Sequence, residues 1–178
     1  YGLKNIPAEL DAAMEESRIV QLTDSGSSGH VGAVLEDGRI FMWGLNDFGQ
    51  CDPPDDIGTL NDPVLKLATG QSHTVALMQD GRVECWGNQE DRRCDTPVDY
   101  LATAAPVREV CAGLLFSACL LEGGILVAWG TDSSTLPDWD TVIPLGAAVD
   151  LPDFFNQTQV PNTPVTSVVS IAGGDSVF

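Results

Sequence analysis

The sequence predicts an all-β protein: a partial, open β-propeller of about three to four four-stranded antiparallel blades. A Trp-Gly pair recurs at a step of 43 residues, at Trp43, Trp86 and Trp129. A Gly-containing turn precedes each pair, and the strand before each turn is apolar on both of its faces. Repeats of this length that form meanders buried on both faces are typical of propeller blades. A β-solenoid is the alternative, disfavoured because its repeats are shorter.

Other positions keep the same step of 43 residues and are therefore predicted to be structural. Phe116 stands in the third copy where the first two copies have histidine, and Ser27 stands in the first copy where the later copies have glycine. The structural repeat positions are Gly38, Gly81, Gly124, Trp43, Trp86, Trp129, His30, His73, Gly70 and Gly113.

A hairpin is predicted in the second copy, where His73 to Gln79 and Arg82 to Trp86 read as two strands. Asp80-Gly81 lies between these apolar runs and predicts a two-residue type I′ turn. Asp37-Gly38 and Gly123-Gly124 take the same place in the other copies. The small residues at the centre of the first strands, such as Ala76, indicate closely stacked sheets.

The whole chain is interpreted as one partial propeller that begins and ends inside a repeat. Its N-terminal segment resembles the tail of a preceding repeat, and Pro7 to Ser17 has a composition that favours a short surface helix. Val165 to Phe178 repeats the start of the second copy after a gap 18 residues too long, which indicates an insertion in the third copy. The resulting divisions are 1–17, repeat one at 18–63, repeat two at 64–106, repeat three at 107–164 with a long insertion at 136–164, and a further repeat beginning at 165–178.

The charge balance restricts the partners. Eight basic residues stand against 26 acidic ones, for a formal net charge of −18. Such a chain repels nucleic acid and anionic lipid, and no apolar run is long enough to span a bilayer. We expect no nucleic acid partner, no direct membrane insertion and no small-molecule ligand. The expected partners are other protein subunits that cover the open blade edges.

The five cysteines include no Cys-x-x-Cys pair, so neither a zinc site nor a disulfide framework is signalled. Cys85, Cys111 and Cys119 lie in apolar strand patterns and are expected to be free, buried thiols. Cys51 and Cys94 occupy equivalent loops of successive repeats, which duplication explains more simply than pairing. Asn156 begins a glycosylation sequon that has meaning only if the chain is secreted.

No residue is predicted to be catalytic, to bind a cofactor or to ligate a metal. The two histidines occupy one repeat position, and no phosphate-binding loop, nucleophile elbow or metal-ligand spacing is present. The insertion at 136–164 carries the aromatic residues Trp139, Phe154 and Phe155. These three residues are the candidate partner contacts, with an irregular surface loop as the alternative reading.

The repeat resembles that of the regulator of chromosome condensation family. The resemblance rests on GQSHTVALMQDGRVECWGN in the second copy and HVGAVLEDGRIFMWGLNDFGQ in the first. It implies propeller blades, and because family propellers close with seven blades, it implies that this chain holds about half a ring. Arg92-Arg93 departs from the Gly-Gln of Gly49-Gln50, a drift expected to leave the fold intact. Members of the family serve as guanine nucleotide exchange factors, ubiquitin-ligase components, enzyme inhibitors and scaffolds.

Two functional hypotheses follow. The first is a non-catalytic interaction or scaffold module, an extrinsic acidic subunit of a larger assembly. We expect it in an organelle lumen, for example the thylakoid, after removal of a presequence, with the cytosol as the alternative. The second hypothesis is a fragment of a seven-bladed regulatory propeller. The fold does not choose between them.

Overall fold

The computed structural model describes residues 5–23, 29–130 and 141–143, and these residues are built mainly of short strands. None of the helices in these ranges is long and apolar enough to cross a membrane. The elements in chain order are α1 (Ala8–Met14), β1 (Ile19–Leu22), β2 (His30–Leu35), β3 (Ile40–Gly44), β4 (Val64–Thr69), β5 (His73–Met78), β6 (Val83–Gly87), the 3-10 helix η1 (Glu90–Arg92), α2 (Val98–Leu101), β7 (Val107–Ala112), β8 (Phe116–Leu121), β9 (Leu126–Gly130) and β10 (Thr141–Ile143).

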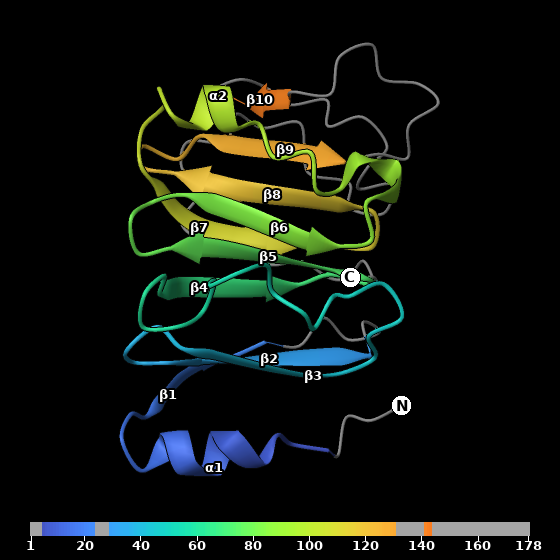
Figure 1. Ribbon diagram of the computed structural model, residues 1–178. Helices are drawn as coiled ribbons and strands as arrows, with labels where there is room; N and C mark the ends of the chain where they lie inside the picture. The colour runs from blue at the N-terminus through green and yellow to red at the C-terminus, as the bar shows by residue number, and fades with distance from the viewer. Residues whose placement is uncertain (1–4, 24–28, 131–140, 144–178) are drawn as a thin grey trace, which may run out of the picture.

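The strands form three antiparallel meander sheets that follow one another along the molecule (Figure 1). We call β1-β2-β3 sheet one, β4-β5-β6 sheet two and β7-β8-β9-β10 sheet three. The stack begins at α1 and ends at β10 and α2, and it does not close into a ring. The predicted all-β fold of open, propeller-type blades is confirmed.

The number of strands differs between the blades. Sheet three has the expected four strands, whereas sheets one and two have three each among the described residues. After β3, Pro53 and Pro54 lack the N–H groups that a ladder needs. Among the described residues only Gly58 bonds the edge, where its O accepts from Ile40 N at 3.0 Å. After β6, the chain forms α2 instead of a strand. In the part of the chain that the structure describes, β10 is therefore the only strand in a fourth position.

The hairpin turn of sheet two differs from the predicted two-residue type I′ turn. That turn needs positive φ at both central residues, but in the Asp80-Gly81 pair only the glycine has it, at φ 92°. Met78 N donates to Arg82 O at 2.8 Å, which closes a loop of three residues, Gln79 to Gly81. This is the three-residue hairpin that ends in a left-handed glycine.

Each pair of neighbouring sheets encloses its own core. The core between sheets one and two contains Val34, Leu67 and Trp86, and that between sheets two and three contains Leu77 and Trp129. All five side chains are at most 3% exposed. The strands are therefore buried on both faces, as their continuous apolar sequences predict.

Helix α1 covers the outer face of sheet one. Leu10 and Ala13, three residues apart on one side of the helix, are buried against Ala33 and Leu35 of β2. The helix lies at the end of the stack in Figure 1. The segment Pro7 to Ser17, for which a surface helix is expected, thus protects a sheet face that has no neighbouring blade among the described residues.

Candidate interaction surface

The repeat positions meet between the sheets in a hydrogen-bonded unit that occurs twice. His30 begins β2, and its Nε2 lies 3.1 Å from Thr74 Oγ1 of sheet two, which donates to Gln50 O at 2.9 Å. At the 43-residue step, His73 Nε2 lies 3.0 Å from Ser117 Oγ of sheet three, which donates to Arg93 O at 2.7 Å. Since each hydroxyl proton is already used, each histidine donates from Nε2.

Burial keeps His73 neutral. Its side chain lies between sheets two and three, and burial, helped by the charge of Arg93, lowers the pKa of His73 to about 3. Nδ1 has no hydrogen-bond partner among the described residues and lies against Gly70, where a Cβ would meet the imidazole ring. Phe116 lies against Gly113 in the same way. This arrangement places His73 in inter-sheet packing, away from solvent.

Arg93 occupies the position that Gln50 has in the first copy. Both residues are at most 2% exposed. The Arg93 guanidinium donates to Ser72 Oγ at 2.8 Å and to Leu114 O at 3.3 Å, and it forms an ion pair with Asp91 at 2.6 Å. Where the first copy has the glutamine of the Gly-Gln motif, the second copy thus has a buried cation that forms several bonds between sheets two and three.

The expectation that Cys85 is a free buried thiol is wrong. Cys85 on β6 forms a disulfide with Cys94, with a Cα–Cα distance of 5.1 Å. Comparison of the copies does not predict this pair, because only one of its two cysteines recurs in the first copy. Cys51 matches Cys94, but Met42 stands at the position of Cys85. Cys51 is free, and Cys111 and Cys119 are buried free thiols as expected, with burial raising the pKa of each to about 12. Protonated buried thiols are poor nucleophiles.

Replacing Cys94 by serine is expected to lower the free energy of unfolding by about 2–3 kcal/mol, because the disulfide restricts a short loop in the unfolded chain. The matched control is Cys51→Ser at the equivalent repeat position, where the free thiol is expected to matter little. Urea unfolding followed by circular dichroism measures both. Equal midpoints for the two variants, together with no effect of reductant on the wild type, would contradict the disulfide's contribution.

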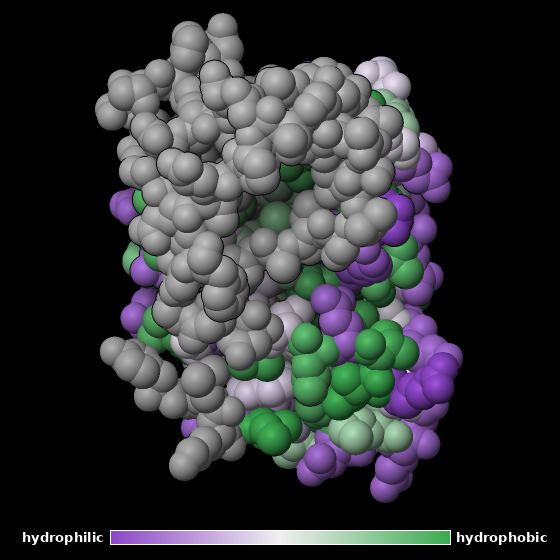
Figure 2. Space-filling model, turned by 180° about the vertical axis from the view of Figure 1, so that it is seen from behind, coloured by the Kyte–Doolittle hydropathy of each residue, from purple (hydrophilic) through white to green (hydrophobic). Residues whose placement is uncertain are grey.

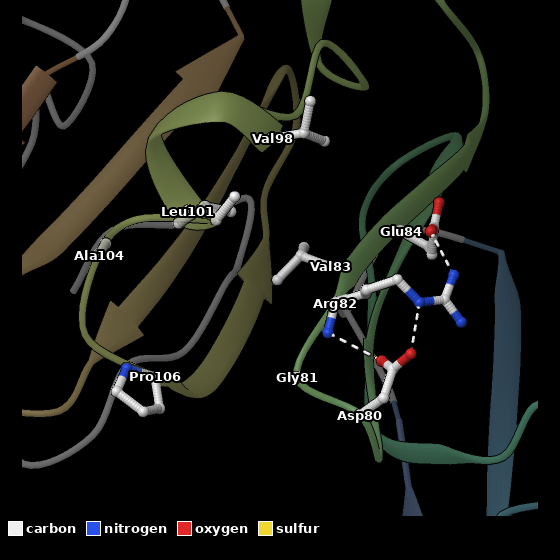
Figure 3. Close-up of a pocket in the computed structure, with 10 residues that line it drawn as sticks. Asp80, Gly81, Arg82, Val83, Glu84, Val98, Leu101, Ala104 and Pro106 are labelled. Atoms are coloured by element: carbon white, nitrogen blue, oxygen red, sulfur yellow. Dashed lines mark hydrogen bonds and ion pairs between the residues drawn. The ribbon is translucent and has the colours of Figure 1, made fainter.

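A groove of about 470 Å³ lies beside the outer edge of sheet two. One wall is the turn and start of β6, and the other is α2 with the segment that follows it. We call it the β6 groove; its lining residues are Asp80, Gly81, Arg82, Val83, Glu84, Val98, Leu101, Ala102, Ala104 and Pro106. Figure 3 shows Val83 directed toward Leu101 and Ala104. Val98 is 62% exposed.

A charged cluster forms the hairpin side of the β6 groove (Figure 3). Arg82 bonds three carboxylates, with Asp80 and Asp62 each at 2.6 Å and Glu84 at 2.9 Å. These bonds raise the pKa of Arg82 above its usual value, hydrogen bonding to Asp80 being the largest cause, so the guanidinium stays charged. One cation against three anions leaves this side of the groove negative.

A second apolar area lies on the first strands of the sheets. Val20 and Leu22 of β1 and Leu65 of β4 are each at least 50% exposed. Figure 2 shows hydrophobic side chains at the surface in the lower half of the face opposite to that of Figure 1. Apolar surface of this kind is typical of contact areas.

The remaining predicted features are distributed as follows. No group of three or more potential metal ligands occurs among residues 5–23, 29–130 and 141–143. The candidate contacts Trp139, Phe154 and Phe155, the sequon at Asn156 and most of the 136–164 insertion lie outside the described residues. Sequence reasoning missed the β6 groove, because its two walls come from a hairpin and from a helix about 20 residues later.

Several solved structures share this fold. Human WBSCR16 aligns with a TM-score of 0.56 and 19% identity over 71% of this chain and 38% of that one. Prp20p from Saccharomyces cerevisiae aligns with a TM-score of 0.55 and 22% identity, over 94% of this chain and 42% of Prp20p. The CRINKLY WD40 ectodomain of the Arabidopsis thaliana receptor kinase ACR4 aligns with a TM-score of 0.53 and 17% identity, over 90% of this chain and 44% of the ectodomain. The chain thus spans less than half the length of each.

Sequence comparison identifies one repeat directly. No curated protein matches the chain. Residues 64–92, which include β4, β5 and β6, match the family model described as the regulator of chromosome condensation (RCC1) repeat. This segment carries the motif on which the resemblance rests. The chain therefore contains a regulator of chromosome condensation repeat within an open stack of propeller-type blades.

Proposed function

We propose that this chain is a non-catalytic protein-interaction module that binds a partner at the outer edge of sheet two. The observation that carries the proposal is the β6 groove, which combines apolar side chains with a negatively charged rim. The groove has a volume of about 470 Å³, and exposed apolar surface rimmed by polar residues is typical of protein–protein interaction sites.

The fold supports the proposal in general terms. Propeller-type structures with the same repeat include yeast RCC1 (Prp20) bound to Kap60, and Prp20p is described with binding properties to Gsp1p and histones. These partners are those of the yeast protein. For this chain, the net charge of −18 favours a partner with a basic surface. We propose an extrinsic acidic subunit of a larger assembly, with the fragment of a seven-bladed regulatory propeller as the second candidate.

The disulfide supports an oxidising compartment for the proposed subunit. Disulfides persist in secretory and comparable oxidising environments and are rare in the cytosol. The pair Cys85–Cys94 therefore favours an organelle lumen or an extracellular location over the cytosol. Thiol labelling of the chain from its native source under denaturing, non-reducing conditions would then modify three cysteines and not five.

The interaction proposal is tested by carbodiimide cross-linking of the complex isolated from the native source. This reagent joins carboxylates to lysines, which suits a chain with 26 acidic residues. We expect cross-links from Glu84, Asp80 or Asp62 to lysines of one partner. Elution of the polypeptide at its own mass, without intermolecular cross-links, would overturn the proposal. Cross-links only at distant carboxylates such as Glu36 would keep the module but move its binding surface.

A further inference from the structure

We propose that the outer edge of β6 is a strand-acceptor site, at which an extended segment of a partner protein pairs with Val83 and Cys85 as the fourth strand of sheet two. The inference rests on the proposed function and specifies its partner. Strand addition to an open sheet edge gives affinity through main-chain hydrogen bonds and specificity through side-chain pockets.

The repeat itself shows where the fourth strand belongs. In sheet three, β10 pairs with β9, with Thr141 opposite Ala128, Val142 opposite Val127 and Ile143 opposite Leu126. Subtracting the step of 43 residues from Leu126 to Ala128 gives Val83 to Cys85 of β6. The same position in sheet one is Ile40, whose N–H donates to Gly58 O at 3.0 Å. The outer edge is thus bonded in sheets one and three.

In sheet two, no described residue pairs with this edge. Val83 and Cys85 make no backbone hydrogen bond on that side to any described residue. The chain forms α2 where the edge-bonding segment would be, and the β6 groove separates α2 from the edge (Figure 3). The groove therefore overlaps the fourth-strand position at Val83 and Glu84.

The backbone of β6 is oriented for pairing. Met78 N donates to Arg82 O, so the polar groups of Arg82 and Glu84 face β5. Because these groups alternate along an antiparallel strand, those of Val83 and Cys85 face outward, and Val83 lines the groove on that side. Two residues at strand spacing lie about 7 Å apart. A segment of three residues, like β10, can bond both.

The side chains of β6 define the sequence of the segment. Directly opposite residues of paired strands place their side chains on the same face of the sheet. The central residue would lie opposite Glu84, where sheet three has Val127 instead. The second oxygens of Glu84 and Asp62 make no bond to the described residues, so a lysine or arginine is favoured there. The residue opposite Val83 faces Leu101 and Ala104 and is apolar.

Charge argues against the other occupants. A second copy of this chain would bring another −18 of net charge to a negative rim. Residues 131–178 of the chain contain no lysine or arginine to place opposite Glu84. The occupant is therefore an extended, cationic segment of a different protein, with the pattern small or β-branched, basic, apolar.

The test uses the full chain and synthetic hexapeptides that contain Thr-Lys-Ile, Thr-Glu-Ile or Thr-Lys-Ala. NMR titration of the ¹⁵N-labelled chain is expected to show Thr-Lys-Ile binding at the Val83 and Cys85 amides and slowing their hydrogen exchange. The other two peptides are expected to bind at least about tenfold more weakly, because one places a like charge opposite Glu84 and the other lacks the apolar side chain. Glu84→Gln is expected to weaken the binding of the Thr-Lys-Ile peptide about two- to fivefold. Glu84→Lys is expected to make the chain prefer the Thr-Glu-Ile peptide. Glu36→Gln, on sheet one, is the matched control without effect.

Backbone methylation separates strand pairing from side-chain docking. N-methylation of the Ile, whose N–H would donate to Val83 O, is expected to abolish binding, whereas N-methylation of the Lys, whose N–H points away, is tolerated. Equal effects of the two methylations would overturn strand addition. Binding without charge preference would overturn the cationic partner, and absence of binding would overturn the acceptor site. In each case the native cross-linking experiment still decides independently whether the chain is an interaction module.

Discussion

Replacing Trp86 by alanine is expected to lower the free energy of unfolding by about 3–5 kcal/mol, the usual range for removing a large buried aromatic side chain. Trp86 is 3% exposed and packs between sheets one and two with Leu67 and Met78. Its indole N–H also donates to Gln50 O at 3.1 Å. The variant therefore loses both an apolar core residue and a hydrogen bond between blades. Urea unfolding followed by far-UV circular dichroism measures the loss.

The control is Trp43→Ala, at the same position of the first repeat. Trp43 packs against the core beneath α1 and is only half-buried, because no blade precedes sheet one among the described residues. We expect Trp43→Ala to lower the free energy of unfolding clearly less than Trp86→Ala does. Equal losses would show that the stacking of blades does not determine the value of this repeat position.

Replacing His73 by phenylalanine is expected to remove part of the pH dependence of stability. The folded chain holds the pKa of His73 at about 3, whereas an unfolded histidine titrates at about 6.5. Between these values the unfolded state binds the proton and the folded state does not, so the free energy of unfolding falls as the pH drops. This contribution amounts to roughly 1.4 kcal/mol per pH unit below about pH 6.

The variant is expected to fold because Phe116 occupies the same position in the third copy, against Gly113. Ser117 also keeps its hydrogen bond to Arg93 O. Unfolding by urea at pH 7.5 and pH 5 compares the two proteins. The wild type is expected to lose about 2 kcal/mol more than His73→Phe over this interval. Equal losses would contradict a neutral, buried His73.

Part of the site was accessible from the repeat and part was not. The step of 43 residues predicts structural roles for His73 and Trp86, because a repeated residue is constrained by the same packing in each copy, and both side chains are buried. The repeat could not predict the hydrogen bond from His73 to Ser117 of the next sheet, because the sequence of one copy does not indicate which residue of the neighbouring blade a side chain contacts. The disulfide of Cys85 with Cys94 was missed because it breaks the repeat.

The sequence by itself determined the all-β class, the three meanders and their stacking, because the Trp-Gly step and strands apolar on both faces are local patterns that only stacked blades can bury. Tertiary structure alone decided how each blade ends. Sheet three ends in a fourth strand, sheet one in the single bond of Gly58, and sheet two lies beside helix α2. The segments that form these endings have only weak hydrophobic patterns in the sequence. Their conformations depend on contacts with neighbouring blades, and as a result the outer edge of β6 is unpaired among the described residues.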